Sequence, residues 1–181
     1  MSNPAWLVRV ASEDDRALLA PFECANPRVA WQVEVESFIR TRLLDWAFES
    51  GAADDEPRVL LVLHRRTGAL IGVAAHERLL LREAKAGGSS NFYGTRLQVV
   101  AVAKKWQGKK LGKVRVSDVV MSAATTDIAS RVPPRPRILA VVHKDNVQSL
   151  ALCGRYGFVV ELSSRHPSYR HLMTADDGVV E

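Results

Sequence analysis

The sequence predicts a single α/β (α+β) domain, in which a mixed central sheet of about seven strands carries helices on both faces. Its length of 181 residues and its hydrophobic content of 47% suit one domain with a sizeable buried core. Short apolar runs typical of strands alternate with segments of helical periodicity. Some successive strands are joined by tight turns and others by helices, so antiparallel and parallel pairs are expected in the same sheet.

The N-terminal part is expected to begin with a strand and two helices. The segment WLVRVA (6–11) is typical of a short strand, and SEDDRALLAPF (12–22) begins a helix with a capping serine and early acidic residues. Residues 22–31 break this pattern and are expected to form a loop. A second helix, ended by Gly51, is predicted over about residues 32–50, because apolar residues recur there at helical spacing: Val35, Phe38, Ile39, Leu43 and Trp46.

The middle of the chain is expected to form three strands. RVLLVLHR (58–65) and ALIGVAAHERLLL (69–81) flank the tight turn RTG (66–68), which predicts a hairpin. Residues 82–91 (REAKAGGSSN) are expected to form a loop, and TRLQVVAVA (95–103) a further strand.

The C-terminal part alternates helices and strands. RILAVVH (137–143) predicts a strand, a short helix follows and stops at Gly157, and FVVELS (158–163) and YRHLM (169–173) predict a final strand pair. Without an internal repeat or a low-complexity linker, residues 1–181 are interpreted as one domain with a flexible end at 174–181. The helix that precedes these elements is predicted to run to about Ala129 by the spacing of Val116, Val119, Val120, Ala123 and Ile128.

Composition excludes several classes of protein. The charged content of 25% beside 47% hydrophobic residues argues against wholesale disorder. No apolar run approaches the roughly 20 residues that a membrane helix needs, and the first residues lack the pattern of a signal peptide. The two cysteines, Cys24 and Cys153, fit a reducing cytosol, and Cys and His show no zinc-like spacing. We therefore expect a cytoplasmic protein with no membrane partner and no metal.

The stretch KKWQGKKLG (104–112) lies between a predicted strand and a predicted helix, an arrangement that can bind an anion. The first turn of a helix has unpaired N–H groups and partial positive charge, and glycine lets the backbone approach a phosphate. The stretch matches neither GxxxxGK[ST] nor GxGxxG, and a basic surface turn is the plainer interpretation. The net charge of +5 favours a polyanion such as nucleic acid or a phosphate-rich cofactor. Six basic residues gather here: Lys104, Lys105, Lys109, Lys110, Lys113 and Arg115.

Two motifs in this region resemble those of the GNAT superfamily (GCN5-related N-acetyltransferases). Gln107 to Gly112 resembles the loop Q/R-x-x-G-x-G/A, with Lys110 in place of the middle glycine. That lysine either contacts a phosphate or crowds the backbone approach. NVQSLALCGRYGF (146–158) resembles N-x-x-S/A-x-x-L-Y-x-x-x-G-F, with Cys153 where the family has tyrosine. The resemblance spans residues 6–173, its specific part is 97–158, and it implies the GNAT fold.

The resemblance implies that acetyl-CoA binds where the strands 95–103 and 137–143 separate. Backbone groups of residues 100–102 would face the pantetheine arm, and amides of residues 108–112 would hold the pyrophosphate. Lysines of the loop could reach the 3′-phosphate. The cofactor-binding residues expected in this way are Val100, Ala101, Val102, Gln107, Gly108, Lys109, Lys110, Leu111, Gly112, Lys113, Asn146 and Ser149.

The implied reaction is acetyl transfer to a primary amine, and it needs a proton donor and a proton acceptor. Cys153 either donates a proton to the leaving thiolate or is an inert core residue, and Tyr156 is the other candidate donor. Glu77 is a candidate base, with a paired core carboxylate as its structural alternative. Water without a dedicated base is equally compatible, because the family's strand glutamate is replaced by Arg96.

The acceptor is expected to be a small molecule, a peptide or an aminoacyl-tRNA. It would contact the loop after the first helix and the helix that follows this loop, the segment GGSSNFYG and the turn SRHPSY, and a homodimer is left open. Two alternatives to a general N-acetyltransferase are a toxin that acetylates aminoacyl-tRNA and a non-catalytic acyl-CoA-binding regulatory module. The expected substrate-binding residues are Phe22, Glu23, Phe92, Tyr93, Arg96, His166 and Tyr169.

Overall fold

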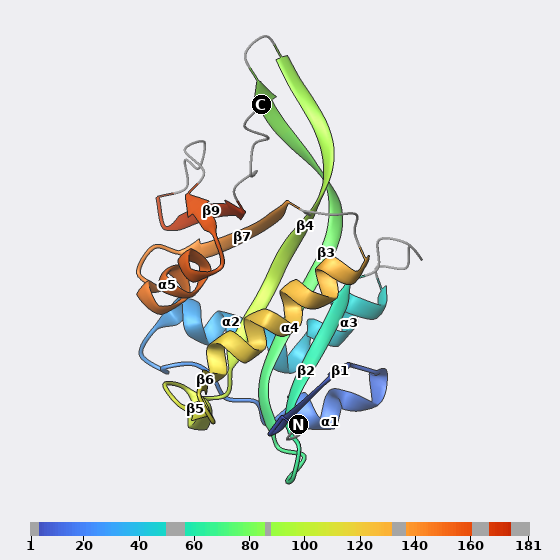
Figure 1. Ribbon diagram of the computed structural model, residues 1–181, viewed down its shortest axis with the longest axis vertical. Coiled ribbons are helices and arrows are strands. Elements are labelled where there is room, and N and C mark those ends of the chain that lie inside the picture. The colour runs from blue at the N-terminus through green and yellow to red at the C-terminus, as the bar shows by residue number, and fades with distance from the viewer. Residues whose placement is uncertain (1–3, 50–56, 86–87, 132–136, 161–166, 175–181) are drawn as a thin grey trace.

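The computed structural model describes residues 4–49, 57–85, 88–131, 137–160 and 167–174. Within these ranges the chain forms a seven-stranded mixed sheet with helices on both faces, as the sequence predicts (Figure 1). In spatial order the strands are β1 (Trp6–Val10), β2 (Arg58–His64), β3 (Leu70–Lys85), β4 (Gly88–Val102), β7 (Ile138–His143), β9 (Tyr169–Thr174) and β8 (Phe158–Val160).

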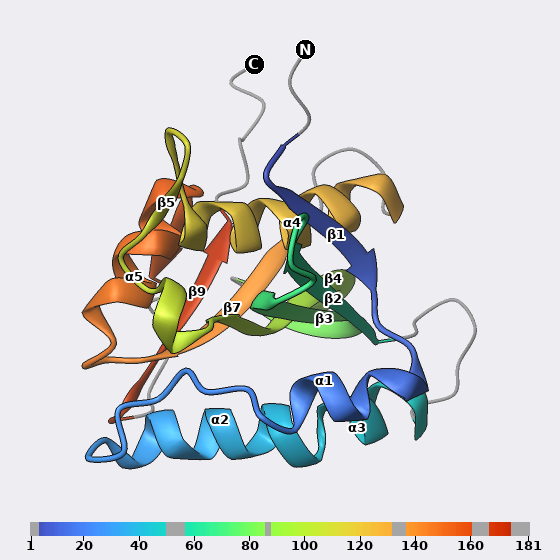
Figure 2. The ribbon, with the colours of Figure 1, turned by 90° about the horizontal axis from the view of Figure 1, so that it is seen from below.

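The helices divide between the two faces of the sheet (Figure 2). One face carries η1 (Glu13–Asp15), α1 (Arg16–Leu19), α2 (Ala30–Thr41) and α3 (Leu43–Glu49), and the other carries α4 (Val116–Arg131) and α5 (Val147–Arg155). The prediction of one helix over 32–50 is wrong, because Arg42 leaves the helical conformation with φ of −127°. This break turns the chain so that both Leu43 and Leu44 are buried.

Two hydrophobic cores lie on opposite faces of the sheet. Alternate residues of β2 supply both, with Leu60 and Val62 facing α4 and Leu61 and Leu63 facing α2 and α3. Gly72 of β3 permits the close approach of α4, because a Cβ there would lie 2.5 Å from the Val120 side chain. The two cores hold the sheet rigidly between its helical layers.

Strands β3 and β4 form a hairpin that is longer than the sequence predicts. Their ladder continues to the pair Lys85 and Gly88, so the expected loop over 82–91 is wrong for its described residues (Figure 1). Beyond His76 and Thr95 this ribbon has no neighbouring strand within the described residues. Residues 82–91 of this ribbon lack the apolar alternation that identifies a strand.

The crossover from β4 through α4 to β7 makes the parallel pair of the sheet. β4 and β7 pair over only three positions, from Thr95 with Ile138 to Leu97 with Ala140. A register shift between β3 and β4 leaves Gln98 as the extra residue of a bulge at this point. After Leu97 the two parallel strands separate, and this separation positions the candidate site.

The connection from β4 to α4 contains a small hairpin that the sequence analysis did not anticipate. After η2 (Lys104–Trp106), the strands β5 (Lys110–Leu111) and β6 (Val114–Arg115) pair around Gly112 and Lys113. The helix then begins at Val116, where its N–H donates to the carbonyl of Lys109 at 3.1 Å. The glycine-lysine stretch therefore projects as a hairpin beside the start of α4.

Candidate functional site

The separation of β4 and β7 opens a cavity of about 160 Å³ in the sheet. Residues 97–100 of β4 and residues 140–143 of β7 form its two walls. Helix α2 closes it on one face through Trp31, and α5 closes it on the other through Cys153. The edge of β4 that faces β7 lacks a strand partner here within the described residues, so its backbone groups are available to a bound molecule.

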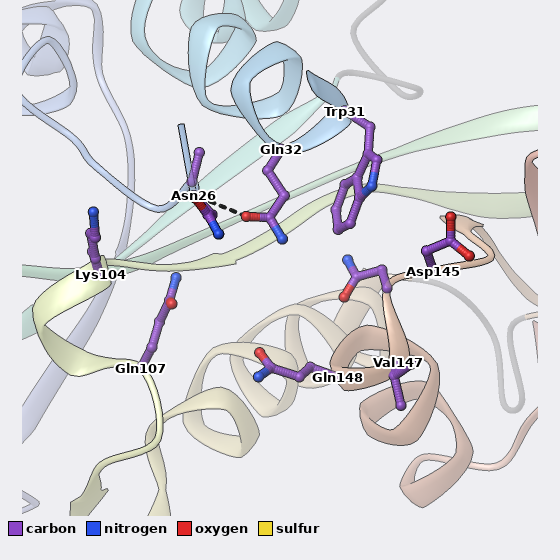
Figure 3. A pocket seen from close by; sticks show the side chains of 10 residues that line it. Asn26, Trp31, Gln32, Lys104, Gln107, Asp145, Val147 and Gln148 are labelled. Carbon is purple, nitrogen blue, oxygen red and sulfur yellow. Dashed lines mark hydrogen bonds between the residues drawn. The ribbon is translucent and has the colours of Figure 1, made fainter. Parts of the chain in front are cut away.

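A larger cavity of about 590 Å³ adjoins the first and is shown in Figure 3. The two cavities share Trp31 and Asn146, so one continuous route leads from the glycine-lysine loop to the gap between the strands. Lys104 and Asp145 contribute one charge of each sign to its lining. The rest of the polar lining consists mainly of five carboxamides: Asn26, Gln32, Gln107, Asn146 and Gln148.

Gln107 connects the glycine-lysine loop to the wall of this larger cavity. Its Nε2 donates to the carbonyls of Cys24 at 2.7 Å and Val102 at 3.0 Å. Gly108 and Gly112 have positive φ values of 71° and 63°, which favour glycine. Lys110 sits on β5 and is exposed, so its ordinary strand backbone does not require the family's glycine.

Asn146 caps α5 and also faces both cavities. Its Oδ1 accepts the N–H of Ser149 at 3.1 Å, which is the N-cap arrangement. Ser149 itself lines the smaller cavity. One residue therefore fixes the start of α5 and presents its amide group to the route between the cavities.

Cys153 lines the smaller cavity from α5 and is only 4% exposed. Burial raises the pKa of its thiol to about 11, so the neutral, proton-carrying form is present at neutral pH. A protonated thiol in this place has the form required of a proton donor.

Tyr156, the alternative donor, lies away from the gap. Its hydroxyl donates to the carbonyl of Asp118 on α4 at 2.8 Å, and its ring lines a separate surface pocket beside Ser122. The earlier assignment of Tyr156 as an acid is corrected accordingly, because α5 turns this side chain toward α4.

Glu77 and Arg96 form an ion pair across the β3–β4 ladder, where they are directly opposite. Glu77 is therefore a paired carboxylate, which agrees with the structural alternative that the sequence left open, and it is not among the residues that line the gap. The same contact engages Arg96, which was expected to bind substrate. His76, on the other face of β3, contacts Asp127 at 2.8 Å and likewise belongs to the structural core.

The structure places the expected acceptor residues in different parts of the molecule. Tyr169 lines the smaller cavity, whereas Phe22 is 3% exposed within the core beneath α1–α3. Glu23 is exposed, and its carbonyl accepts the N–H of Lys104 at 2.7 Å. His166 lies outside the described residues.

Phe92 and Tyr93 were also expected at the acceptor site, and the structure places both apart from the gap. They lie on the β3–β4 ribbon, on the far side of the β4–β7 ladder from the gap. Arg137 stacks on the Phe92 ring at 4.3 Å, and Arg78 stacks on the Tyr93 ring at 4.7 Å. They were expected there because a loop was predicted over residues 82–91, where the structure continues strands β3 and β4.

Four polar or aromatic residues that line the smaller cavity were not among the predicted site residues: Trp31, Glu34, Gln98 and His143. Trp31, Glu34 and Val35 have the spacing of one helix face, which is the signal that could have grouped them. His143 ends its strand, and its ring stacks on Trp31 at 5.0 Å with an interplanar angle of 11°. Contacts between such distant segments have no local sequence signal.

The described residues contain no helix long and apolar enough to cross a membrane. No protein-family model matches the chain, and no curated protein sequence matches it.

Solved structures do resemble the chain. A bacterial toxin aligns at 18% identity over 96% of this chain and 92% of its own, with a TM-score of 0.64. A protein described as a GNAT-family acetyltransferase, from Bordetella pertussis, aligns at 20% identity over 96% of each chain, with a TM-score of 0.59. The PaiA N-acetyltransferase from Thermoplasma acidophilum, in complex with coenzyme A, aligns at 18% identity over 96% of this chain and 99% of its own, with a TM-score of 0.54. The likeness at these identities concerns the fold.

Proposed function

We propose that this chain, whose fold is that of the GNAT superfamily, is an acetyl-CoA-dependent N-acetyltransferase acting on a primary amine. One observation carries the proposal: β4 and β7 separate after Leu97 around a cavity that adjoins a larger one, which Lys104 and Gln107 line from the start of the glycine-lysine stretch. The coenzyme A complex of a protein with the same fold supports this choice of donor.

The residues of the two cavities fit the parts of acetyl-CoA. The carboxamides of Gln107, Asn146 and Gln148 suit the two amide groups of a pantetheine arm. The exposed lysines at 104, 105, 109, 110 and 113 suit its phosphates. The expected backbone donors are the amides of Gly108, Leu111 and Gly112. Gly108 and Gly112 lie outside the paired residues of the β5–β6 hairpin, whereas Leu111 lies within them. Backbone groups of Val100 and Val102 would face the arm along the open edge of β4, whereas those of Ala101, also expected there, point toward β3.

Acetyl transfer then needs a proton donor on one face of the gap and an entrance for the amine on the other. A strand N–H after Leu97 would polarise the thioester carbonyl, and Cys153 would protonate the thiolate that leaves. The acceptor amine would enter from the side of α2 and Tyr169, opposite α5. Cytoplasmic location is part of this proposal, since acetyl-CoA and a free thiol both suit that compartment.

A toxin that acetylates aminoacyl-tRNA is a second candidate, favoured by the similarity to a bacterial toxin. Such an acceptor would require contacts to nucleic-acid phosphates outside the acetyl-CoA loop. Binding of charged tRNA would then weaken steeply with added salt, whereas small amines and peptides would show little salt dependence.

The experiment that tests the proposed function combines binding with turnover. Titration calorimetry with acetyl-CoA and a thiol-release assay with small amines, peptides and aminoacyl-tRNA should show binding and acceptor-dependent CoA release. Binding without CoA release for every acceptor would instead identify a regulatory acyl-CoA-binding module. Failure to bind acetyl-CoA would overturn both assignments.

A further inference from the structure

His143 lies on the acceptor side of the gap and has no part in the acetyl-transfer scheme described so far. It is the last residue of β7, in which Ala140 and Val142 belong to the core beneath α4 and α5. Side chains alternate along a strand, so His143 faces the opposite side, toward α2. Its stacking on Trp31 of α2 agrees with this placement. The gap therefore separates His143 on one face from Cys153 on the other.

Three neighbours hold the imidazole ring of His143 in place. Trp31 stacks on it at 5.0 Å, and Tyr169, its direct partner in the β7–β9 ladder, meets it edge-on at 5.2 Å and 84°. The backbone N–H of Asp145 donates to its Nδ1 at 3.2 Å. The side chain is 15% exposed. Because Nδ1 faces Asp145, the ring nitrogen left for a bound molecule is Nε2.

Asp145 can serve both neutral forms of this ring. Its backbone N–H suits a bare Nδ1, and its carboxylate Oδ2 lies 3.7 Å from the same atom. At 3.7 Å this carboxylate is beyond hydrogen-bond distance of Nδ1, so it must move closer to accept a proton from Nδ1; in that form of the ring the lone pair of Nε2 is available to the cavity. A histidine oriented by a carboxylate through one nitrogen is a common arrangement for accepting a proton at the other.

We propose that His143 accepts the proton of the acceptor amine and that Asp145 is its positioning residue; this inference rests on the proposed acetyl transfer. The amine lone pair forms the C–N bond at the thioester carbonyl carbon, and the C–S bond breaks. The amine proton moves to Nε2 of His143, while Cys153 gives its proton to the departing thiolate. Solvent then takes the proton from His143 and returns one to Cys153, which restores both groups.

Glu34 is the competing group, because its carboxylate reaches the same cavity from α2. It is exposed, and it lies one helical turn after Trp31. Trp31 and Tyr169 hold the imidazole of His143 in the fixed position that proton transfer needs. We therefore assign proton acceptance to His143. The experiment therefore compares both residues.

The test measures CoA release with glycinamide, a lysine peptide with a blocked N-terminus and glycyl-tRNA as acceptors. We expect His143→Gln to lower kcat by about 10²-fold or more, with little change in the KM for acetyl-CoA. Imidazole in the buffer should restore part of the activity of His143→Ala. Asp145→Asn should lower kcat, whereas Asp145→Glu, which keeps a carboxylate, should retain most of the wild-type kcat. His64→Gln is the matched control, since His64 also stacks on a tryptophan but at the end of β2.

Each result supports or overturns either the proposed function or the role of His143. If the wild-type protein releases no CoA with any of the three acceptors, the proposed function is overturned, and this inference with it. An active wild type whose His143→Gln variant retains kcat within about threefold overturns the inference alone. Loss of activity in Glu34→Gln with full activity in His143→Gln assigns proton acceptance to Glu34. Lost activity without imidazole rescue, together with a lowered Tm, assigns His143 a structural role.

Discussion

At the scale of single residues, the chemistry of the gap depends most on Cys153. If its thiol protonates the leaving group, Cys153→Ala should lower kcat by about 10²-fold or more, because no other proton replaces it at the same place. Cys24→Ala is a matched control. Burial also raises the pKa of that thiol, to about 12, but it lies in the loop after α1. Steady-state CoA release measures both variants, and a change under about threefold for Cys153→Ala would leave it as a core residue.

Lys110 carries the second prediction at this scale. The side chain is exposed and its backbone is that of a strand, so it does not crowd the loop. We therefore expect that Lys110→Gly and Lys110→Ala both weaken acetyl-CoA binding, by about three- to tenfold, as for one exposed charge contact. Calorimetry at low and high salt measures this loss, which should shrink as salt is added. Binding that improves in the glycine variant alone would show that the lysine strains the turn.

At the scale of elements, the sequence identifies what local patterns encode. Apolar periodicity predicted α4 and most of the sheet strands, and Gly157 ends α5 with φ of 77° as expected. The far end of the β3–β4 ribbon was missed because residues 82–91 (REAKAGGSSN) have no apolar alternation to detect. The acceptor wall was predicted only in part: Tyr169 was expected there, whereas Trp31 and His143 were missed for another reason. Trp31, His143 and Tyr169 come from three distant segments, and only the tertiary fold brings them together.

The loop after α1 is held over the larger cavity by a single carboxylate of α2. Glu36 accepts the N–H groups of Cys24 at 2.6 Å and Ala25 at 2.8 Å. Such charge-assisted hydrogen bonds are strong, so Glu36→Ala should loosen this loop while the sheet remains folded. Hydrogen exchange should then accelerate at Cys24 and Ala25, and acetyl-CoA should bind more weakly. Unchanged exchange at these two amides would show that the other contacts of the loop, from Gln32, Lys104 and Gln107, hold it without Glu36.

At the scale of the whole molecule, the site results from how one helix joins two strands. The crossover through α4 makes β4 and β7 parallel neighbours, and the bulge at Gln98 coincides with the end of their pairing. The position of α4 on the sheet therefore sets the width of the gap. Two features fix that position: the close approach at Gly72, and a charged cluster of Asp127 with Arg58 and His76.

The charged cluster gives the molecule a pH-dependent stability that can be measured. Burial alone would raise the pKa of Asp127, but the hydrogen bond from His76 and the charge of Arg58 outweigh it and lower the pKa. A carboxyl whose pKa is lowered by folding contributes stability above its unfolded value, and this contribution is lost as pH falls through the folded value. Asp127→Asn should therefore destabilise the protein at pH 7, by about 1–3 kcal/mol, since it leaves Arg58 and His76 poorly paired.

The same argument fixes how this difference changes with acidity. The contribution begins to decline below about pH 4, the ordinary range of an unfolded carboxyl, and is lost as the folded carboxyl takes up its proton at a lower pH, so the free energies of unfolding of wild type and Asp127→Asn should converge there. Urea denaturation at several pH values measures this directly. Asp45→Asn is the matched control, because Asp45 pairs with Arg16 at 2.6 Å on the exposed surface and should change stability by less than about 1 kcal/mol. A constant difference between wild type and Asp127→Asn from pH 7 to pH 3 would mean that side-chain shape, and not charge, fixes α4 on the sheet.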